Sequence, residues 1–132
     1  MWTAHTHPEG YHAGSCVTFL SDGQTIATGG VDGKVRLWDL KGHEQATLPF
    51  SKEKEEFVEA LAVSPDGRLL AAGGDNPLHT PCYVVVWNLA SRKEVSRLDI
   101  HDSSVEAVVF SPDGTQMYVA LEGPTLAIYA LE

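Results

Sequence analysis

Three histidines near the start of the chain, His5, His7 and His12, are of a type that binds metal ions. In an extended segment His5 and His7 point to the same side, and a loop would return His12 toward them. Zinc or nickel would suit such a group, but a structural zinc site takes four ligands and the fourth is missing here. The simpler interpretation is a polar segment rich in histidine. We therefore expect no cofactor and keep a metal site as the alternative.

Serine, histidine and aspartate, the residue types of a hydrolytic triad, are all present. The sequence contains no nucleophile elbow, no glycine-rich phosphate loop and no metal-ligand spacing of a strong, specific kind. Its two cysteines, Cys16 in an apolar strand pattern and Cys82 in an expected loop, have no spacing typical of a disulfide framework or a zinc site. The sequence therefore predicts a protein that is not an enzyme.

The overall composition indicates one globular domain, residues 1–132, with a net charge of −9. This acidity argues against binding to nucleic acid, which needs a basic patch, and against docking on anionic lipid. No apolar run approaches the roughly 20 residues of a membrane span, and no signal peptide is visible at the N-terminus. We therefore expect an intracellular protein, cytoplasmic or in another compartment inside the cell.

An internal repeat organises the chain. The turn sequence SDG at 21–23 returns as SPDG at 64–67 and at 111–114, so that its aspartates are 44 and 47 residues apart. Apolar strands flank each turn, and no segment of useful length has the helical period. Charged residues 51–56 are expected to form a loop rather than a helix start, because the segment after them aligns with a strand of the next unit. These features predict an all-β protein with a period of about 45 residues.

The first and second units each contain four candidate strands, and the third unit contains three. The expected first strands are 16–19, 59–63 and 106–110, and the second strands are 25–30, 69–74 and 116–121. The third strands, which end near an aromatic residue, are 34–40, 83–89 and 125–131, and the fourth strands are 44–50 and 94–100.

A period of this length with four strands and a Trp-Asp ending resembles the WD40 repeat, whose units are the blades of a β-propeller. The similarity is strongest over residues 19–40, FLSDGQTIATGGVDGKVRLWDL, and covers nearly the whole chain as three units. It implies three four-stranded antiparallel blades, at approximately 8–50, 51–100 and 101–132. Residues 1–7 then stand where a closing strand is expected.

The resemblance also implies a buried hydrogen-bond network in each blade, made by a histidine, a serine or threonine, an aspartate and a tryptophan. No unit holds the complete set, and a buried network is expected to be satisfied throughout or absent. The matching residues are Thr28, Asp32 and Trp38 in the first unit, Trp87 in the second and His101 in the third. His12 is near the histidine position of the first unit, at which Gly10 stands.

The resemblance to WD40 proteins implies a rigid platform that binds proteins or peptides. The loops that would do so are 5–13, 50–57, 75–82 and 101–104. The loop 75–82 is five residues longer than the matching turns of the first and third units. The candidate contact residues in these loops are His12, Glu53, Glu55, Glu56, Leu78 and His79. The three glutamates would suit a basic partner.

Three blades are too few for a closed propeller, which typically has 4–8. Two copies joined head to tail would give a ring of six blades, our preferred assembly, and three copies would give nine. Two alternatives remain open. The chain is a fragment or regulatory repeat tail of a larger signalling or effector protein, or it is a metal-binding or enzymatic propeller that uses the N-terminal histidines.

Overall fold

The computed structural model describes residues 16–30, 32–50, 57–75, 82–100, 103–123 and 125–131. The regular structure in these ranges consists of β-strands, which confirms the predicted fold class. The strands are β1 (Cys16–Phe19), β2 (Thr25–Gly29), β3 (Lys34–Asp39), β4 (Glu44–Pro49), β5 (Phe57–Val63), β6 (Leu69–Asp75), β7 (Cys82–Asn88), β8 (Lys93–Ile100), β9 (Val105–Phe110), β10 (Gln116–Leu121) and β11 (Leu126–Ala130). Across the described ranges, no helix is long and apolar enough to cross a membrane.

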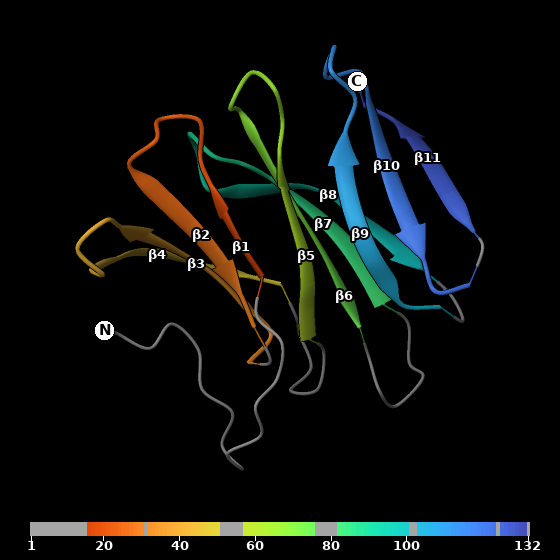
Figure 1. Cartoon of the computed structure of the whole chain (residues 1–132), viewed down its shortest axis with the longest axis horizontal. Helices are drawn as coiled ribbons and strands as arrows, with labels where there is room; N and C mark the ends of the chain where they lie inside the picture. Colours follow the sequence, from red (N-terminus) through yellow and green to blue (C-terminus); the bar gives the residue numbers. More distant parts are fainter. Residues whose placement is uncertain are drawn as a thin grey trace.

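The strands form three antiparallel sheets in chain order, as predicted for three blades (Figure 1). The first sheet has the order β1-β2-β3-β4 and the second the order β5-β6-β7-β8. In the described part of the chain the third sheet has three strands, in the order β11-β10-β9. Within each sheet, a strand pairs with its neighbour in sequence, because the turns between them are short enough for direct reversal.

The observed strands follow the predicted ones within one or two residues at each end, with one difference that matters. Cys82 was expected in a loop, but it is the first residue of β7 and is 4% exposed. The apolar run of β7 continues through it, since Cys82 pairs with Ile100 of β8. The expected closing strand at 1–7 lies outside the described residues.

The turn between the first two strands of each sheet needs a backbone that glycine adopts most easily. Gly67 has a φ of +73°, in the left-handed region where a side chain is strained. A Cβ on Gly67 would also lie 2.0 Å from Oγ of Ser21, which belongs to the equivalent turn of the first sheet. The Asp-Gly pair therefore closes its own hairpin and also lets two neighbouring turns approach each other.

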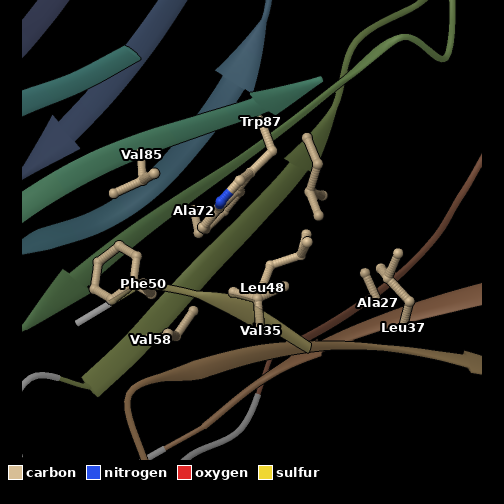
Figure 2. Packing of buried hydrophobic residues seen from close by; sticks show 10 residues of the cluster. Ala27, Val35, Leu37, Leu48, Phe50, Val58, Ala72, Val85 and Trp87 are labelled. Carbon is tan, nitrogen blue, oxygen red and sulfur yellow. The ribbon is translucent and has the colours of Figure 1, made fainter. Parts of the chain in front are cut away.

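Two apolar clusters join the three sheets face to face. Figure 2 shows the junction of the first and second sheets, where Val35, Leu48 and Phe50 face Val58, Val85 and Trp87. The junction of the second and third sheets contains Ala60, Ala71, Cys82, Val84, Val86, Ile100, Val105, Val108, Met117 and Val119. The second sheet is thus buried on both faces, as expected for the middle blade of a row, and the apolar run of β7 fits that position.

The sheets fan out from their first strands, because β1, β5 and β9 lie beside one another (Figure 1). Two edges of the molecule follow from the antiparallel order. The turns at 20–24, 64–68 and 111–115 form the turn edge, drawn at the top of Figure 1. At the opposite edge, the loop edge, β2, β6 and β10 end and β3, β7 and β11 begin. The chain also passes from one sheet to the next at the loop edge.

Candidate functional site

A buried hydrogen bond joins two of the residues that the sequence singled out. Nε1 of Trp38 on β3 donates to Oγ1 of Thr28 on β2 at a distance of 2.8 Å. The two side chains are 6% and 7% exposed. They share one face of the first sheet because Ile26 pairs with Trp38 and Thr28 with Arg36. Their bond holds the second and third strands together on the face turned away from the second sheet.

Asp32, the third residue predicted in this set, lies in the turn between β2 and β3. Its Oδ1 accepts a hydrogen bond from the backbone N–H of Lys34 at 3.2 Å, and its Oδ2 pairs with Nη2 of Arg36 at 3.0 Å. Arg36 thus sits between the aspartate and the Thr28–Trp38 pair, and the sequence did not identify it. His12, which is near the histidine position of this unit, lies outside the described residues.

The second and third units differ from the first at these positions. Trp87 is 1% exposed and packs in the first junction together with Ala72, which replaces the threonine. In the third sheet the positions of Thr28 and Trp38 are taken by Val119 and Tyr129. His101 lies outside the described residues. The threonine–tryptophan bond is therefore a feature of the first sheet, and the other two sheets replace the hydroxyl with an apolar side chain.

The loop edge is where the predicted partner-binding segments attach. The described strands that flank them end or begin at Pro49 and Phe57, at Asp75 and Cys82, and at Ile100. Neighbouring sheets are joined at this edge by a backbone hydrogen bond of 3.1 Å from the N–H of Val58 to the carbonyl of Gly30. The candidate contact residues themselves, His12, Glu53, Glu55, Glu56, Leu78 and His79, lie outside the described residues, as do His5 and His7.

Arg97 on β8 fixes the chain where it leaves the first sheet, and sequence reasoning missed it. Its Nη1 donates to the carbonyl of Phe50 at 2.9 Å, and its Nη2 pairs with Oε1 of Glu94 at 2.7 Å. The guanidinium also lies over the ring of Tyr83, 5.2 Å from its centre. One side chain of the second sheet thus anchors the end of the first sheet beside the loop edge. A pairing over 47 residues leaves no local signal in the sequence.

The turn edge carries aspartates whose carboxylates are held by their own turns. Hydrogen bonds from the hydroxyls of Ser111 and Thr115 and from the N–H of Thr115 lower the pKa of Asp113 to about 2. The pKa of Asp66 is lowered by the hydroxyl of Ser64 and the N–H of Arg68. The sequence analysis identified the repeated Ser-Pro-Asp-Gly motif of these turns. It did not infer that the serine hydroxyl donates a hydrogen bond to the aspartate. The carboxylates are engaged in closing hairpins, which suits architecture more than proton transfer.

The chemistry of the remaining candidate groups is also local. Sγ of Cys16 lies 3.5 Å from the carbonyl oxygen of Val58, and burial raises the pKa of its thiol to about 11. Within the ranges that the structure covers, no group of three histidines, cysteines, aspartates or glutamates is placed to hold a metal ion. The arrangement of the described residues provides a stacked scaffold with two accessible edges.

The sequence matches the family described as "WD domain, G-beta repeat" at three places, residues 3–39, 40–76 and 92–129. These matched segments are offset from the sheets. The last one begins with β8 of the second sheet and continues through β9, β10 and β11 of the third. The second match likewise starts with β4 of the first sheet and continues through β5 and β6 of the second.

Similar proteins include two named Protein HIR1. That of Eremothecium gossypii is 23% identical over 97% of this chain and 24% of its own length. That of Yarrowia lipolytica is 28% identical over 86% of this chain and 14% of its own length. The Small ribosomal subunit protein RACK1y of Oryza sativa subsp. japonica is 32% identical over 89% of this chain and 33% of its own length. The chain spans a third or less of the length of these curated relatives.

Proposed function

The chain belongs to the WD40 repeat family, and from this we propose that it is a non-enzymatic scaffold for protein–protein interaction. The observation that carries the proposal is the loop edge. At this edge the packed strands connect to two kinds of segment, those between second and third strands and those between sheets. Both kinds therefore start from the same side of the molecule. Loops that a rigid framework holds in fixed positions are well suited to binding.

The partner we propose is a basic protein or peptide. The chain has a net charge of −9, and Glu53, Glu55 and Glu56 belong to the segment between β4 and β5 at the loop edge. Acidic side chains gathered on one edge attract a basic partner and speed its association. Leu78 and His79, in the segment between β6 and β7, would add contacts beside them.

The scaffold associates with itself in this proposal, with two copies forming a ring of six blades in preference to three copies forming nine. The three sheets fan about their first strands and do not close a ring in the described part of the chain. The location we propose is intracellular. The name of the rice relative, a small ribosomal subunit protein, supports this location.

The test is binding of a fluorescent peptide of alternating lysine and serine, measured by anisotropy at several salt concentrations. The E53Q/E55Q/E56Q variant is expected to bind about tenfold more weakly, because it loses three charges of the segment that we propose as the contact. The control variant E44Q/E94Q removes two charges from exposed residues at the starts of β4 and β8, away from the loop edge. It is expected to bind like the wild type within about twofold.

Equal losses in the two variants would mean that only net charge matters and would remove the loop edge from the proposal. A wild-type chain that binds neither this peptide nor its acidic counterpart, of alternating glutamate and serine, would contradict the proposed partner. Tighter binding of the acidic peptide would contradict it as well.

A further inference from the structure

In the described part of the chain β11 is the outermost strand of the third sheet (Figure 1), yet it has the composition of an interior strand. Edge strands of soluble proteins usually carry charged residues or proline, which discourage pairing with another chain. The outer strands of the other two sheets follow this rule, since β4 contains Glu44 and Pro49 and β8 contains four charged residues. β11 contains neither a charged residue nor proline. Its composition therefore suits a strand that is paired on both sides.

One face of the sheet beside this edge is apolar and accessible. Leu126 and Ile128 of β11 are 59% and 55% exposed. They lie on the same face, two residues apart, and Tyr118 of β10 pairs with Ile128. An added strand would thus meet both unpaired backbone groups and apolar side chains.

The first two sheets show which residue a fourth strand places beside Leu126. Counted from the aromatic residue of the third strand, Leu126 stands where Val35 stands in the first sheet and Val84 in the second. Val35 pairs with Leu48 of β4, and Val84 pairs with Leu98 of β8. In both sheets, therefore, the fourth strand supplies a leucine at this position.

A small residue recurs two positions before that leucine. Ile128 stands where Leu37 and Val86 stand in the other sheets. Leu37 pairs with Ala46 and Val86 pairs with Ser96. The complement of β11 is therefore an antiparallel strand in which a small residue, any residue and a leucine follow one another.

The residue between these two positions points to the opposite face, toward the preceding sheet. In β8 it is Arg97, which pairs with Val85 and donates to the carbonyl of Phe50 at 2.9 Å. Ile100 ends the second sheet as Phe50 ends the first, two residues after the leucine. An arginine opposite Ala127, the counterpart of Val85, would reach the carbonyl of Ile100 in the same way.

The charge of the third unit also favours a basic strand. Residues 101–132 contain five acidic residues and no lysine or arginine. One of them, Glu122, is exposed in the turn between β10 and β11, next to the end of β11 where an antiparallel strand would finish. Opposite charges attract such a strand and fix its orientation. Basic residues are therefore expected around the leucine.

We propose that β11 binds an extended basic segment of a partner protein, which becomes the fourth strand of the third sheet and contains the order small residue, arginine, leucine. Main-chain hydrogen bonds provide affinity in this mode of binding, and side chains on alternating faces provide specificity. The site goes beyond the proposed function, because it lies at the outer side of β11 and not at the loop edge.

The probe is a fluorescent peptide, Lys-Lys-Val-Ser-Arg-Leu-Lys-Ile, which is the sequence of β8 with its two acidic residues replaced by lysine. Its binding to the full chain is measured by anisotropy. The control peptide has arginine and leucine exchanged, which keeps composition and charge but moves each side chain to the other face. The control is expected to bind about tenfold more weakly, because the leucine no longer lies beside Leu126.

Two variants of the chain locate the peptide. Leu126→Lys is expected to weaken binding about tenfold, because it removes an apolar contact and repels a basic strand. Val109→Lys is the matched control, since Val109 is 56% exposed on the same face but lies on β9, with β10 between it and the edge. It is expected to bind like the wild type within about twofold. Hydrogen exchange should slow in β11 when the peptide binds.

Several results would overturn the proposal: a wild type that does not bind the peptide, equal binding of the two peptides, equal losses in the two variants, or slowed exchange elsewhere than in β11. The E53Q/E55Q/E56Q variant separates this site from the loop edge and is expected to bind the peptide like the wild type within about twofold. A tenfold loss in that variant would move the peptide to the loop edge, which also contradicts the site on β11.

Discussion

The indole N–H of Trp38 ends on the hydroxyl of Thr28, 2.8 Å away and shielded from water, in the first sheet alone of the three. The second sheet keeps the tryptophan as Trp87 and replaces the threonine with Ala72. The chain thus contains its own comparison between a tryptophan with this partner and a tryptophan without it.

Thr28→Val is expected to lower the free energy of unfolding by about 1–2 kcal/mol, because a buried donor loses its acceptor. Trp38→Phe should cost more, since it also removes packing. The double variant should cost less than the sum of the two single changes, by about 1 kcal/mol, because the residues act through one bond. Urea unfolding of the four proteins measures this coupling. Strict additivity would show that the bond contributes nothing.

The approach of Val58 to Gly29 gives a second prediction. Gly29→Ala is expected to destabilise the chain by about 1–3 kcal/mol, because the added methyl overlaps Cγ1 of Val58 and the packed core resists the shift. Val58→Ala alone leaves a cavity and also destabilises. In the double variant the two defects should partly cancel, and thermal unfolding measures how far. If the double variant loses as much stability as the two single variants together, the contact with Val58 is not the reason why position 29 requires glycine.

Arg97 gives a third prediction, about the anchoring of the first sheet on the second. Arg97→Met is expected to lower the free energy of unfolding by about 1–3 kcal/mol, because the carbonyl of Phe50 loses a charged donor. Arg68→Met is the matched control, since the Arg68 side chain is 82% exposed and its carboxylate contact is 3.9 Å long. Its effect should stay within about 0.5 kcal/mol. Similar losses in both variants would assign the effect to net charge.

The turn aspartates predict how stability depends on pH. In the folded chain the pKa of Asp113 is lowered to about 2 from an ordinary value of 3.8, so folding favours its carboxylate. This contribution is complete above the ordinary value and is lost as the pH falls from about 3.8 to about 2. Asp22, Asp39 and Asp66 are shifted in the same direction and add to the loss.

The measurement is the unfolding free energy between pH 6 and pH 2, together with an NMR titration of the Asp113 carboxyl group. Ser111→Ala is expected to raise the pKa of Asp113, because the hydroxyl is the strongest influence on it. The acid loss of stability should be smaller in that variant. A titration midpoint for Asp113 at its ordinary value would contradict the hydrogen-bonded turn.

The order of the strands was predictable because the turn aspartates recur at nearly equal distances and each hairpin is local. Contacts between sheets were not predictable in the same way. Arg97 donates to the carbonyl of Phe50, 47 residues away in the sequence, and no local sequence pattern at either residue indicates this contact. Cys82 was misplaced in a loop because Pro81 precedes it, although the apolar run that follows it belongs to the same strand.

The offset between matched repeats and sheets has a consequence for how the chain unfolds. Because residues 92–129 contribute β8 to one sheet and β9–β11 to the next, a boundary between repeats never coincides with a boundary between sheets. One repeat cannot unfold without breaking the pairing of strands in a sheet that it shares with the next repeat. The three sheets are therefore expected to unfold cooperatively, so that Trp38 and Trp87 report one common unfolding transition. Destabilising the first or the third sheet should also destabilise the second.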